Sequence, residues 1–144
     1  MEKFIRTYQR ELVYVGLAIA IYIAYRVYKQ RRIRKLELPT NPDAPAPRSG
    51  FNPEAEAKMI YDELSTWNVA LERRSEMFTY ILGYAENELR QVHNAYLKLY
   101  QNANKKTLAE LIRGEWLWTP GEYFGPASER RNEILKRLRD LGAA

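Results

Sequence analysis

The chain has 144 residues, of which 46% are hydrophobic and 28% charged, and its net charge is +5. This composition is that of a folded protein, and the length suits one modest domain with an appendage. The absence of cysteine excludes disulfides and thiolate chemistry, and one histidine cannot form a His-rich metal site within one chain. We therefore expect no cofactor and no metal, although carboxylate-only sites remain open.

Positive charge is concentrated at the N-terminal end of the chain. Residues 1–38 hold nine Lys or Arg and three Glu, a net charge of +6, whereas residues 39–53 are neutral and residues 54–144 carry −1. The excess lies beside an apolar stretch, so anionic lipid is a simpler partner for it than nucleic acid.

Residues 12–28 form that apolar stretch, with no charged residue between Glu11 and Arg26. As a helix it would extend for roughly 26 Å, at the short end for a hydrocarbon core of ~30 Å. Tyrosines near its two ends resemble the aromatic belts of membrane spans. We expect residues 1–36 to be a single-pass transmembrane anchor that suits a thin bilayer. A cleaved signal peptide is disfavoured because Ala18-Ile19-Ala20 follows only about six apolar residues, and a buried soluble helix is the other alternative.

Basic residues flank the stretch unequally. Three precede it, whereas six follow and are placed to meet lipid headgroups: Arg26, Lys29, Arg31, Arg32, Arg34 and Lys35. Positive charge is retained on the cytoplasmic side of membranes. The C-terminal part should therefore face the cytoplasm, or the interior of a membrane-bounded particle.

Small residues recur at every fourth position of the stretch, at Gly16, Ala20 and Ala24. This spacing allows close helix–helix approach in a membrane, and the hydroxyl of Tyr22 needs a polar partner there. We expect these four residues to support helix packing and self-association. The alternative is that Gly and Ala are simply common in such helices.

Residues 37–53 form a proline-rich linker that contains five of the seven prolines. Proline at this density favours an extended, semi-rigid spacer with a reach of roughly 40 Å. The alternative is an extended segment packed on a partner.

Residues 54–144 show helical periodicity, and no segment alternates with period two. Asn52 with Pro53 at the first helical position, and the capping box of Thr107 and Glu110, mark two helix starts. The fold class predicted is all-α, with a small four- or five-helix bundle. Its helices are expected over about 53–66, 69–82 and 86–101, after Thr107, in a short turn after Thr119, and over about 127–141.

Part of this pattern, residues 57–117, loosely resembles one annexin-type repeat. The resemblance rests on Leu89, Val92, Tyr96 and Tyr100 along one predicted helix and on Leu108, Ile112, Glu115 and Trp116 along the next. It implies a right-handed bundle of four or five short helices. The glycine-rich calcium loop of that family is missing, because the matching place reads Ser65-Thr66-Trp67-Asn68-Val69, so calcium-dependent lipid binding is not implied.

No nucleophile, phosphate-loop or metal motif occurs in the sequence. His93 is interpreted as a partly buried helix residue. The pairs Glu72/Glu76 and Glu129/Glu133 are interleaved with basic residues, and are read as solvated ion-pair faces rather than glycosidase carboxylates. A basic strip on the last helix could meet phosphate, although acidic neighbours weaken that reading: Arg130, Arg131, Lys136, Arg137 and Arg139.

Four aromatic residues gather within nine positions, at Trp116, Trp118, Tyr123 and Phe124. They either close one end of the bundle or form a protein contact site, where Trp and Tyr are enriched. We keep them as candidate partner contacts.

These features predict a membrane-anchored structural or interaction protein rather than an enzyme. It would hold a small helical domain near other protein subunits, in a cell-envelope complex or a membrane-containing virion, and homo-oligomerisation is one way to do so. The alternatives are a membrane-tethered, carboxylate-dependent cell-wall glycosidase and a membrane-linked nucleic-acid tether.

Overall fold

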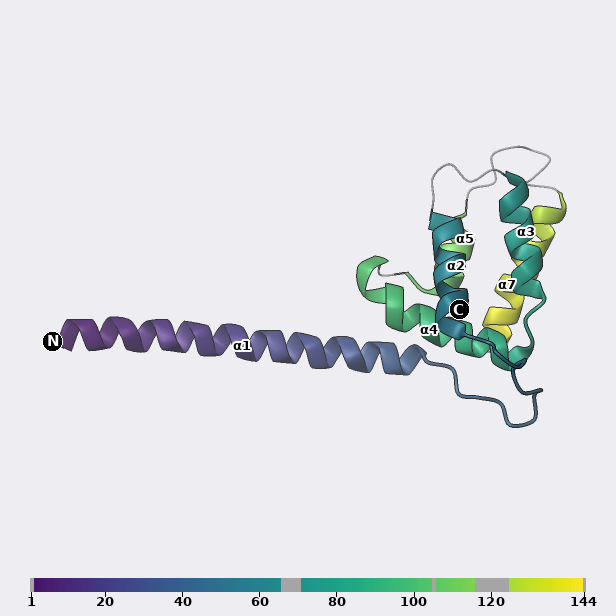
Figure 1. The fold of residues 1–144 in the computed structure, drawn as a ribbon. Helices are drawn as coiled ribbons and strands as arrows, with labels where there is room; N and C mark the ends of the chain where they lie inside the picture. The colour runs from purple at the N-terminus through teal and green to yellow at the C-terminus, as the bar shows by residue number, and fades with distance from the viewer. Residues whose placement is uncertain (1, 66–70, 105, 116–124, 144) are drawn as a thin grey trace. The chain divides into compact units, whose positions relative to one another are not determined.

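The computed structural model describes residues 2–65, 71–104, 106–115 and 125–143. All regular secondary structure in these ranges is helical, which confirms the all-α prediction (Figure 1). The chain divides into two compact units, Met1–Lys35 and Leu36–Ala144, which are considered separately below.

The first unit consists of a single long helix, α1 (Glu2–Leu36). It continues well beyond the apolar stretch because its flanks are rich in Lys, Arg, Glu and Gln, which are good helix formers. Every side chain described between Val13 and Tyr28 is exposed. Within the described part of the chain, no helix combines the length and the apolarity that crossing a bilayer requires. The helix is thus confirmed, but its assignment as a transmembrane span is not supported by this finding.

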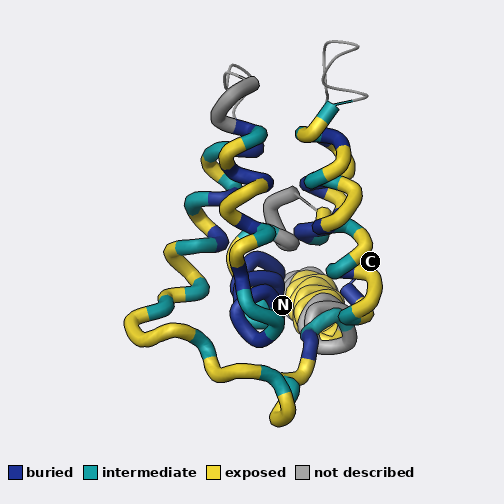
Figure 2. The backbone as a smooth tube through the Cα atoms, turned by 90° about the vertical axis from the view of Figure 1, so that its right-hand side faces the viewer, coloured by how far each residue is buried: buried dark blue, intermediate teal, exposed yellow. Residues whose placement is uncertain are grey.

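The second unit is a bundle of short helices whose described members are α2 (Pro53–Ser65), α3 (Leu71–Leu82), α4 (Glu86–Asn104), α5 (Leu108–Gly114) and α7 (Pro126–Asp140). The most extensive packing pairs α2 with α4 and α3 with α7, and α5 contacts α7 (Figure 1). The inner faces form a single buried core, seen as dark blue in Figure 2. Its largest fully buried apolar side chains are Tyr96, Phe78, Ile60, Ile81, Leu89, Leu97, Leu108, Ile112, Ile134, Leu138 and Val92.

Helix starts follow the predicted capping chemistry. Asn52 Oδ1 accepts hydrogen bonds from the backbone N–H groups of Glu54 and Ala55, at 3.1 and 3.2 Å. At α5, the Thr107 hydroxyl accepts from the N–H of Glu110 at 3.2 Å, and the Glu110 carboxylate accepts from the N–H of Thr107 at 2.6 Å. Both caps satisfy backbone donors that have no partner inside the helix.

The C-terminal end of α7 closes with a left-handed glycine. Gly142 has φ 86°, its N–H donates to Arg139 O, and the N–H of Ala143 donates to Leu138 O at 2.8 Å. This pair of bonds is a Schellman motif, which satisfies helix carbonyls and turns the chain. The turn brings Ala143 into the same core as Leu38, which lies far away in sequence.

Residues 37–52, which we call the strap, join α1 to α2 and contain no helix or strand. Their extended conformation agrees with the proline content. They do not form a free spacer, however, because a series of hydrogen bonds attaches them to α4. The sequence left open a spacer or a segment packed on a partner, and the structure differs from both, because the segment packs on α4 of the same chain.

Candidate functional site

The predicted helix-packing residues lie on α1. Gly16, Ala20 and Ala24 are four positions apart and therefore share one helix face, and they are exposed. No atom lies within 4 Å of a Cβ placed on Gly16, so the face is open at that point. Tyr22 is exposed at 61%, but it follows Ala20 by two positions, or about 200° around the helix. It belongs to the opposite face and cannot join the other three in a single contact.

The predicted headgroup-binding residues follow on the same helix. The side chains of Arg26 and Arg31 are exposed, and Lys29, Arg32, Arg34 and Lys35 lie on α1 with only their backbone described. The predicted partner contacts, Trp116, Trp118, Tyr123 and Phe124, lie outside the described residues. Their role stays a prediction.

The start of the strap is bound by the side-chain amide of Asn94. Its Oδ1 accepts from the N–H of Leu38 at 2.8 Å, and its Nδ2 donates to the carbonyl of the same residue at 2.8 Å. Lys98 and Glu37 add an ion pair at 3.8 Å, which is too exposed to contribute much. These two hydrogen bonds to one side-chain amide replace the backbone pairing that an extended segment would find in a sheet.

The middle of the strap is bound by Asn87, which is 3% exposed. Asn87 Oδ1 accepts from the N–H of Asn41 at 2.9 Å. Its Nδ2 lies within hydrogen-bonding distance of three carbonyls, those of Asn41, Ala44 and Pro45. Arg90 donates to the carbonyl of Pro39 at 3.0 Å. Asn87, Arg90 and Asn94 stand at i, i+3 and i+7, so one stripe of α4 carries most of the strap contacts.

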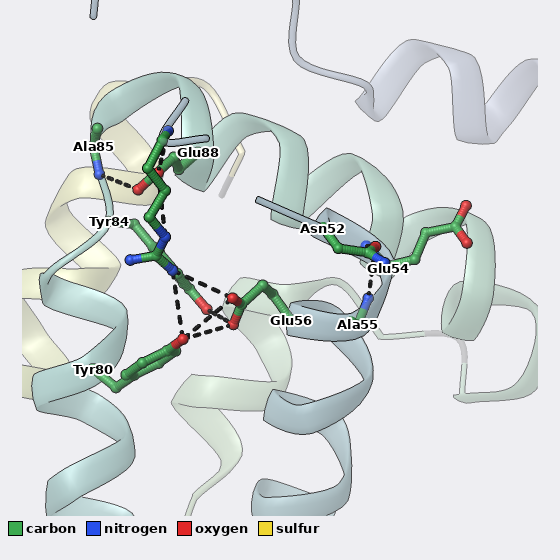
Figure 3. A network of polar contacts seen from close by, with 9 residues as sticks. Asn52, Glu54, Ala55, Glu56, Tyr80, Tyr84, Ala85 and Glu88 are labelled. Carbon is green, nitrogen blue, oxygen red and sulfur yellow. Dashed lines mark hydrogen bonds and ion pairs between the residues drawn. The ribbon is translucent and has the colours of Figure 1, made fainter. Parts of the chain in front are cut away.

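The end of the strap is held by a polar network around Arg48 (Figure 3). The N–H of Arg48 donates to the Glu88 carboxylate at 2.9 Å, and its guanidinium pairs with Glu56 at 3.3 Å. The Glu56 carboxylate also accepts from the hydroxyls of Tyr80 and Tyr84, at 3.0 and 2.8 Å. Burial and the bond to Glu56 raise the pKa of Tyr84, so its hydroxyl stays a donor. The network joins the strap to α2, α3 and α4.

His93 is fully buried and lies beside Leu36, the last residue of α1. Its Nε2 lies 3.1 Å from the carbonyl oxygen of Leu36, and because a carbonyl only accepts, Nε2 carries the hydrogen. Nδ1 then has a lone pair, and no hydrogen-bond partner for it is found among the described residues. Burial lowers the pKa of His93. The residue lies in a helix, as the sequence predicted, but it is fully rather than partly buried, and it binds the end of α1.

Several charged residues of α7 serve as structural donors. Arg137 donates to the carbonyls of Leu82 and Tyr84 at 2.8 and 2.7 Å, which satisfies the C-terminal end of α3. Arg130 donates to the Ser75 hydroxyl, and Arg131 to a backbone carbonyl of α5's C-terminal flank. Three of the five residues in the basic strip are therefore engaged within the bundle. Lys136 and Arg139 remain exposed.

The acidic pairs that the sequence offered as glycosidase carboxylates lie mostly on exposed surface. Glu76, Glu129 and Glu133 are exposed, and the side chain of Glu72 lies outside the described part. Among the described residues, no three carboxylate or histidine side chains are arranged to hold a metal ion.

A buried ion pair, Arg74 with Glu115, was not predicted from the sequence. Arg74 Nε lies 3.4 Å from Glu115 Oε2, and the two side chains are 8% and 9% exposed. Burial raises the pKa of Glu115 in spite of the neighbouring Arg74. Glu115 also lines a pocket of about 390 Å³ at the ends of α2 and α5, with Tyr61, Leu64, Ser65, Lys106, Leu111 and Gly114.

One signal in the sequence could have located the strap site. Asn87, Arg90 and Asn94 form a polar stripe beside the apolar stripe of Leu89, Val92 and Tyr96. Asparagine is a poor helix former, so its recurrence within a helix calls for a tertiary reason such as binding of backbone amides. The stripe identifies a polar contact surface, but not the segment that covers it.

Known proteins provide no relative of this chain. The resemblance to an annexin-type repeat stays a prediction, and residues 66–69 of the region that corresponds to its calcium loop lie outside the described residues. No family model, no curated protein and no solved structure matches this chain.

Proposed function

We propose that this protein is a membrane-anchored structural protein, in which residues 12–28 of α1 form a single span and the helical bundle presents a contact surface to other subunits. The bundle lies on the cytoplasmic side or inside a membrane-bounded particle, the side on which the basic flank is retained.

The observation that carries this proposal is the exposure of large apolar side chains around α1. Val13, Val15, Leu17, Ile19, Ile21 and Ile23 are each 54–68% exposed. Burial of one such side chain contributes about 1.5–3 kcal/mol, so a helix that leaves all of them in water forgoes on the order of 10 kcal/mol. Successive residues advance by about 100°, so these side chains point to opposite sides of the helix. A protein groove would cover only one side, whereas lipid surrounds all of them.

The basic flank supports the choice of lipid. Arg26 lies near the end of the apolar stretch, and five Lys or Arg follow the stretch within seven positions, from Lys29 to Lys35. Each contributes about 1 kcal/mol of attraction to an anionic leaflet. The apolar stretch reaches roughly 26 Å, so the proposal requires a bilayer at the thin end of the usual range.

Membrane insertion is tested by carbonate extraction of the full-length chain from anionic liposomes. The wild-type chain should stay with the vesicles at high pH, and Ile19→Lys, which places a charge in the middle of the span, should be released. Leu99→Lys is the matched control, because it adds the same charge at an exposed leucine of the bundle (43% exposed). Extraction of the wild-type chain would refute the anchor.

A second experiment separates a spanning helix from one that lies in the plane of the membrane. The chain has no native cysteine, so single cysteines can be introduced at Thr7, before the apolar stretch, and at Glu129 in the bundle. A membrane-impermeant maleimide should label the two positions from opposite sides of sealed vesicles. Labelling of both from the same side would exclude a span and leave interfacial binding.

Self-association through Gly16, Ala20 and Ala24 is part of the proposal. Gly16→Ile fills the open face and should lower the dimer fraction in detergent or bilayers. Ala18→Ile changes a residue about 200° away from Gly16 and serves as the control. Equal dimer fractions in both variants would remove this face as the contact.

A further inference from the structure

We propose that the strap detaches from α4 while the helical bundle stays folded, so that the protein has a short state and a long state. This inference does not depend on the membrane proposal, because the contacts that hold the strap all lie within Leu36–Ala144, which forms one compact unit.

The strap is held mainly by hydrogen bonds rather than by apolar burial. Among its residues only Leu38 is buried in the core, with Phe51 partly buried against it, and the others are intermediate or exposed. Figure 2 shows this as a teal and yellow tube, in contrast to the dark-blue inner faces of the helices. Intramolecular hydrogen bonds contribute about 0.5–1.5 kcal/mol each, and ordering a residue costs about 1–2 kcal/mol. The strap therefore has little stability of its own.

The bundle holds together without the strap. Its core is formed by α2, α3, α4, α5 and α7, and among the described residues the buried apolar side chains other than Leu38 lie in or directly beside these helices, whereas Phe51 of the strap is only partly buried. Segments with few buried apolar contacts open separately from the cooperative core of a protein. Detachment of the strap is thus a local opening, distinct from unfolding of the bundle.

The contacts are arranged in series, which sets the order of detachment. Asn94 binds Leu38 near α1, Asn87 binds the strap at and after Asn41, and Arg48 lies at the end next to α2. A displacement applied through α1 reaches the bond between Leu36 and His93 first and the bonds of Leu38 next. Asn87 is the central attachment, because one side chain accepts from one backbone N–H and approaches three carbonyls.

Detachment stops at Arg48. Its guanidinium contacts two carboxylates, Glu56 at 3.3 Å and Glu88 at 3.6 Å, and lies over the rings of Phe51 and Tyr84 at 5.1 and 5.7 Å. Glu56 lies on α2, Glu88 on α4, and Tyr84 in the connection between α3 and α4, and all three are labelled in Figure 3. The proline content keeps a detached strap extended at about 3.1 Å per residue, so residues 37–48 span up to roughly 37 Å in the long state.

Native-state hydrogen exchange on the full chain in detergent micelles tests local opening. The reporters are the strap amides of Leu38 and Asn41, and the core amides of Val92 and Tyr96 in α4. We expect the strap amides to exchange through an opening that is easier than global unfolding and almost independent of urea. Equal protection and equal urea dependence at both sets of amides would overturn the proposal.

Variants distinguish strap release from general destabilisation. Asn87→Ala should speed exchange at Asn41 at least tenfold and leave Val92 and Tyr96 unchanged, and Asn132→Ala, an exposed asparagine of α7, should change neither. If Asn87→Ala also accelerates exchange at the core amides, Asn94→Ala, which frees Leu38, provides a second release variant. Acceleration of strap and core amides alike in both release variants would show that strap and bundle open together, which contradicts the proposal.

The gain in reach is measured by the distance between spin labels on two introduced cysteines, Arg31→Cys and Glu129→Cys. The chain has no native cysteine that would also be labelled. Asn87→Ala should add a component at longer distance to the distribution found with the native strap. An unchanged distribution, combined with faster exchange at Asn41, would show that the strap opens without extending and would overturn the long state.

Discussion

The side-chain amide of Asn94 binds both backbone groups of Leu38, and each of the two hydrogen bonds measures 2.8 Å. An asparagine on α4 thus provides an extended, proline-rich segment with the pairing that a neighbouring strand would otherwise supply. The contact explains why a polar residue stands beside the apolar face of this helix, and it joins the segment after α1 to the bundle.

Removal of this amide should loosen the start of the strap. Asn94→Ala leaves the N–H and the carbonyl of Leu38 without their partner, which we expect to lower the free energy of local opening by about 1–3 kcal/mol. Hydrogen exchange at the Leu38 amide measures this change. Lys98→Ala, which breaks only the exposed ion pair with Glu37, is the control and should cost less than about 1 kcal/mol. A larger effect from Lys98→Ala than from Asn94→Ala would contradict the assignment.

Stability should depend on pH through His93. Its folded pKa lies below the ordinary value of 6.5 because of burial, so the unfolded chain binds the proton more readily. The stabilising contribution is complete above pH 6.5, and it is lost as the pH falls from 6.5 through the folded pKa. Urea unfolding of the full chain in micelles between pH 7.5 and 5.5 should therefore show a falling midpoint.

The control for this pH dependence is His93→Gln, whose side-chain amide retains a donor for Leu36 O but does not titrate. Glu115 acts in the opposite direction, because its raised pKa makes the folded state lose stability as the pH rises above 4.5. That contribution is present in both proteins, so their difference isolates His93. If the urea midpoints of the wild-type chain and of His93→Gln change with pH in parallel across this range, His93 does not cause the pH dependence of stability.

Arg137 should be the most important basic residue of α7 for stability. It donates to two carbonyls at the end of α3, and bonds to charged groups contribute about 1.5–3 kcal/mol. We expect Arg137→Ala to destabilise the bundle by about that amount in urea unfolding. Arg139→Ala removes an exposed arginine from the same helix and should change stability by less than about 0.5 kcal/mol. Equal losses of stability in the two variants would mean that the positive charge of α7, rather than the hydrogen bonds to the end of α3, stabilises the bundle.

The pair Arg74 and Glu115 should show strong coupling. Arg74→Met leaves a buried carboxylate without its partner, which typically costs about 3–5 kcal/mol. The double variant Arg74→Met, Glu115→Leu removes both charges and should recover most of that loss. A double-mutant cycle in urea gives the coupling, and additive single effects would show that the pair does not interact.

The amino-acid sequence alone determined the helical class, most helix boundaries and the inward faces of the bundle. Helix starts can be predicted because caps use local side-chain chemistry, as at Asn52 with Pro53 and at Thr107 with Glu110. A buried helix face can be predicted because its apolar residues recur with the period of the helix, as do Leu89, Val92 and Tyr96. Apolar residues 12–28 were equally visible as a helix. Local interactions suffice for each of these features, so no knowledge of the fold is required.

Only the tertiary structure decided where the strap lies and what the polar side chains do. The prolines predict an extended segment, but its attachment to Asn87 and Asn94 joins positions 46 and 56 residues apart. Likewise Arg137 reaches carbonyls more than 50 positions away, and Arg74 pairs with Glu115 across the bundle. Hydrogen bonds and ion pairs of this kind depend on distances between distant parts of the chain, which periodicity and composition do not encode.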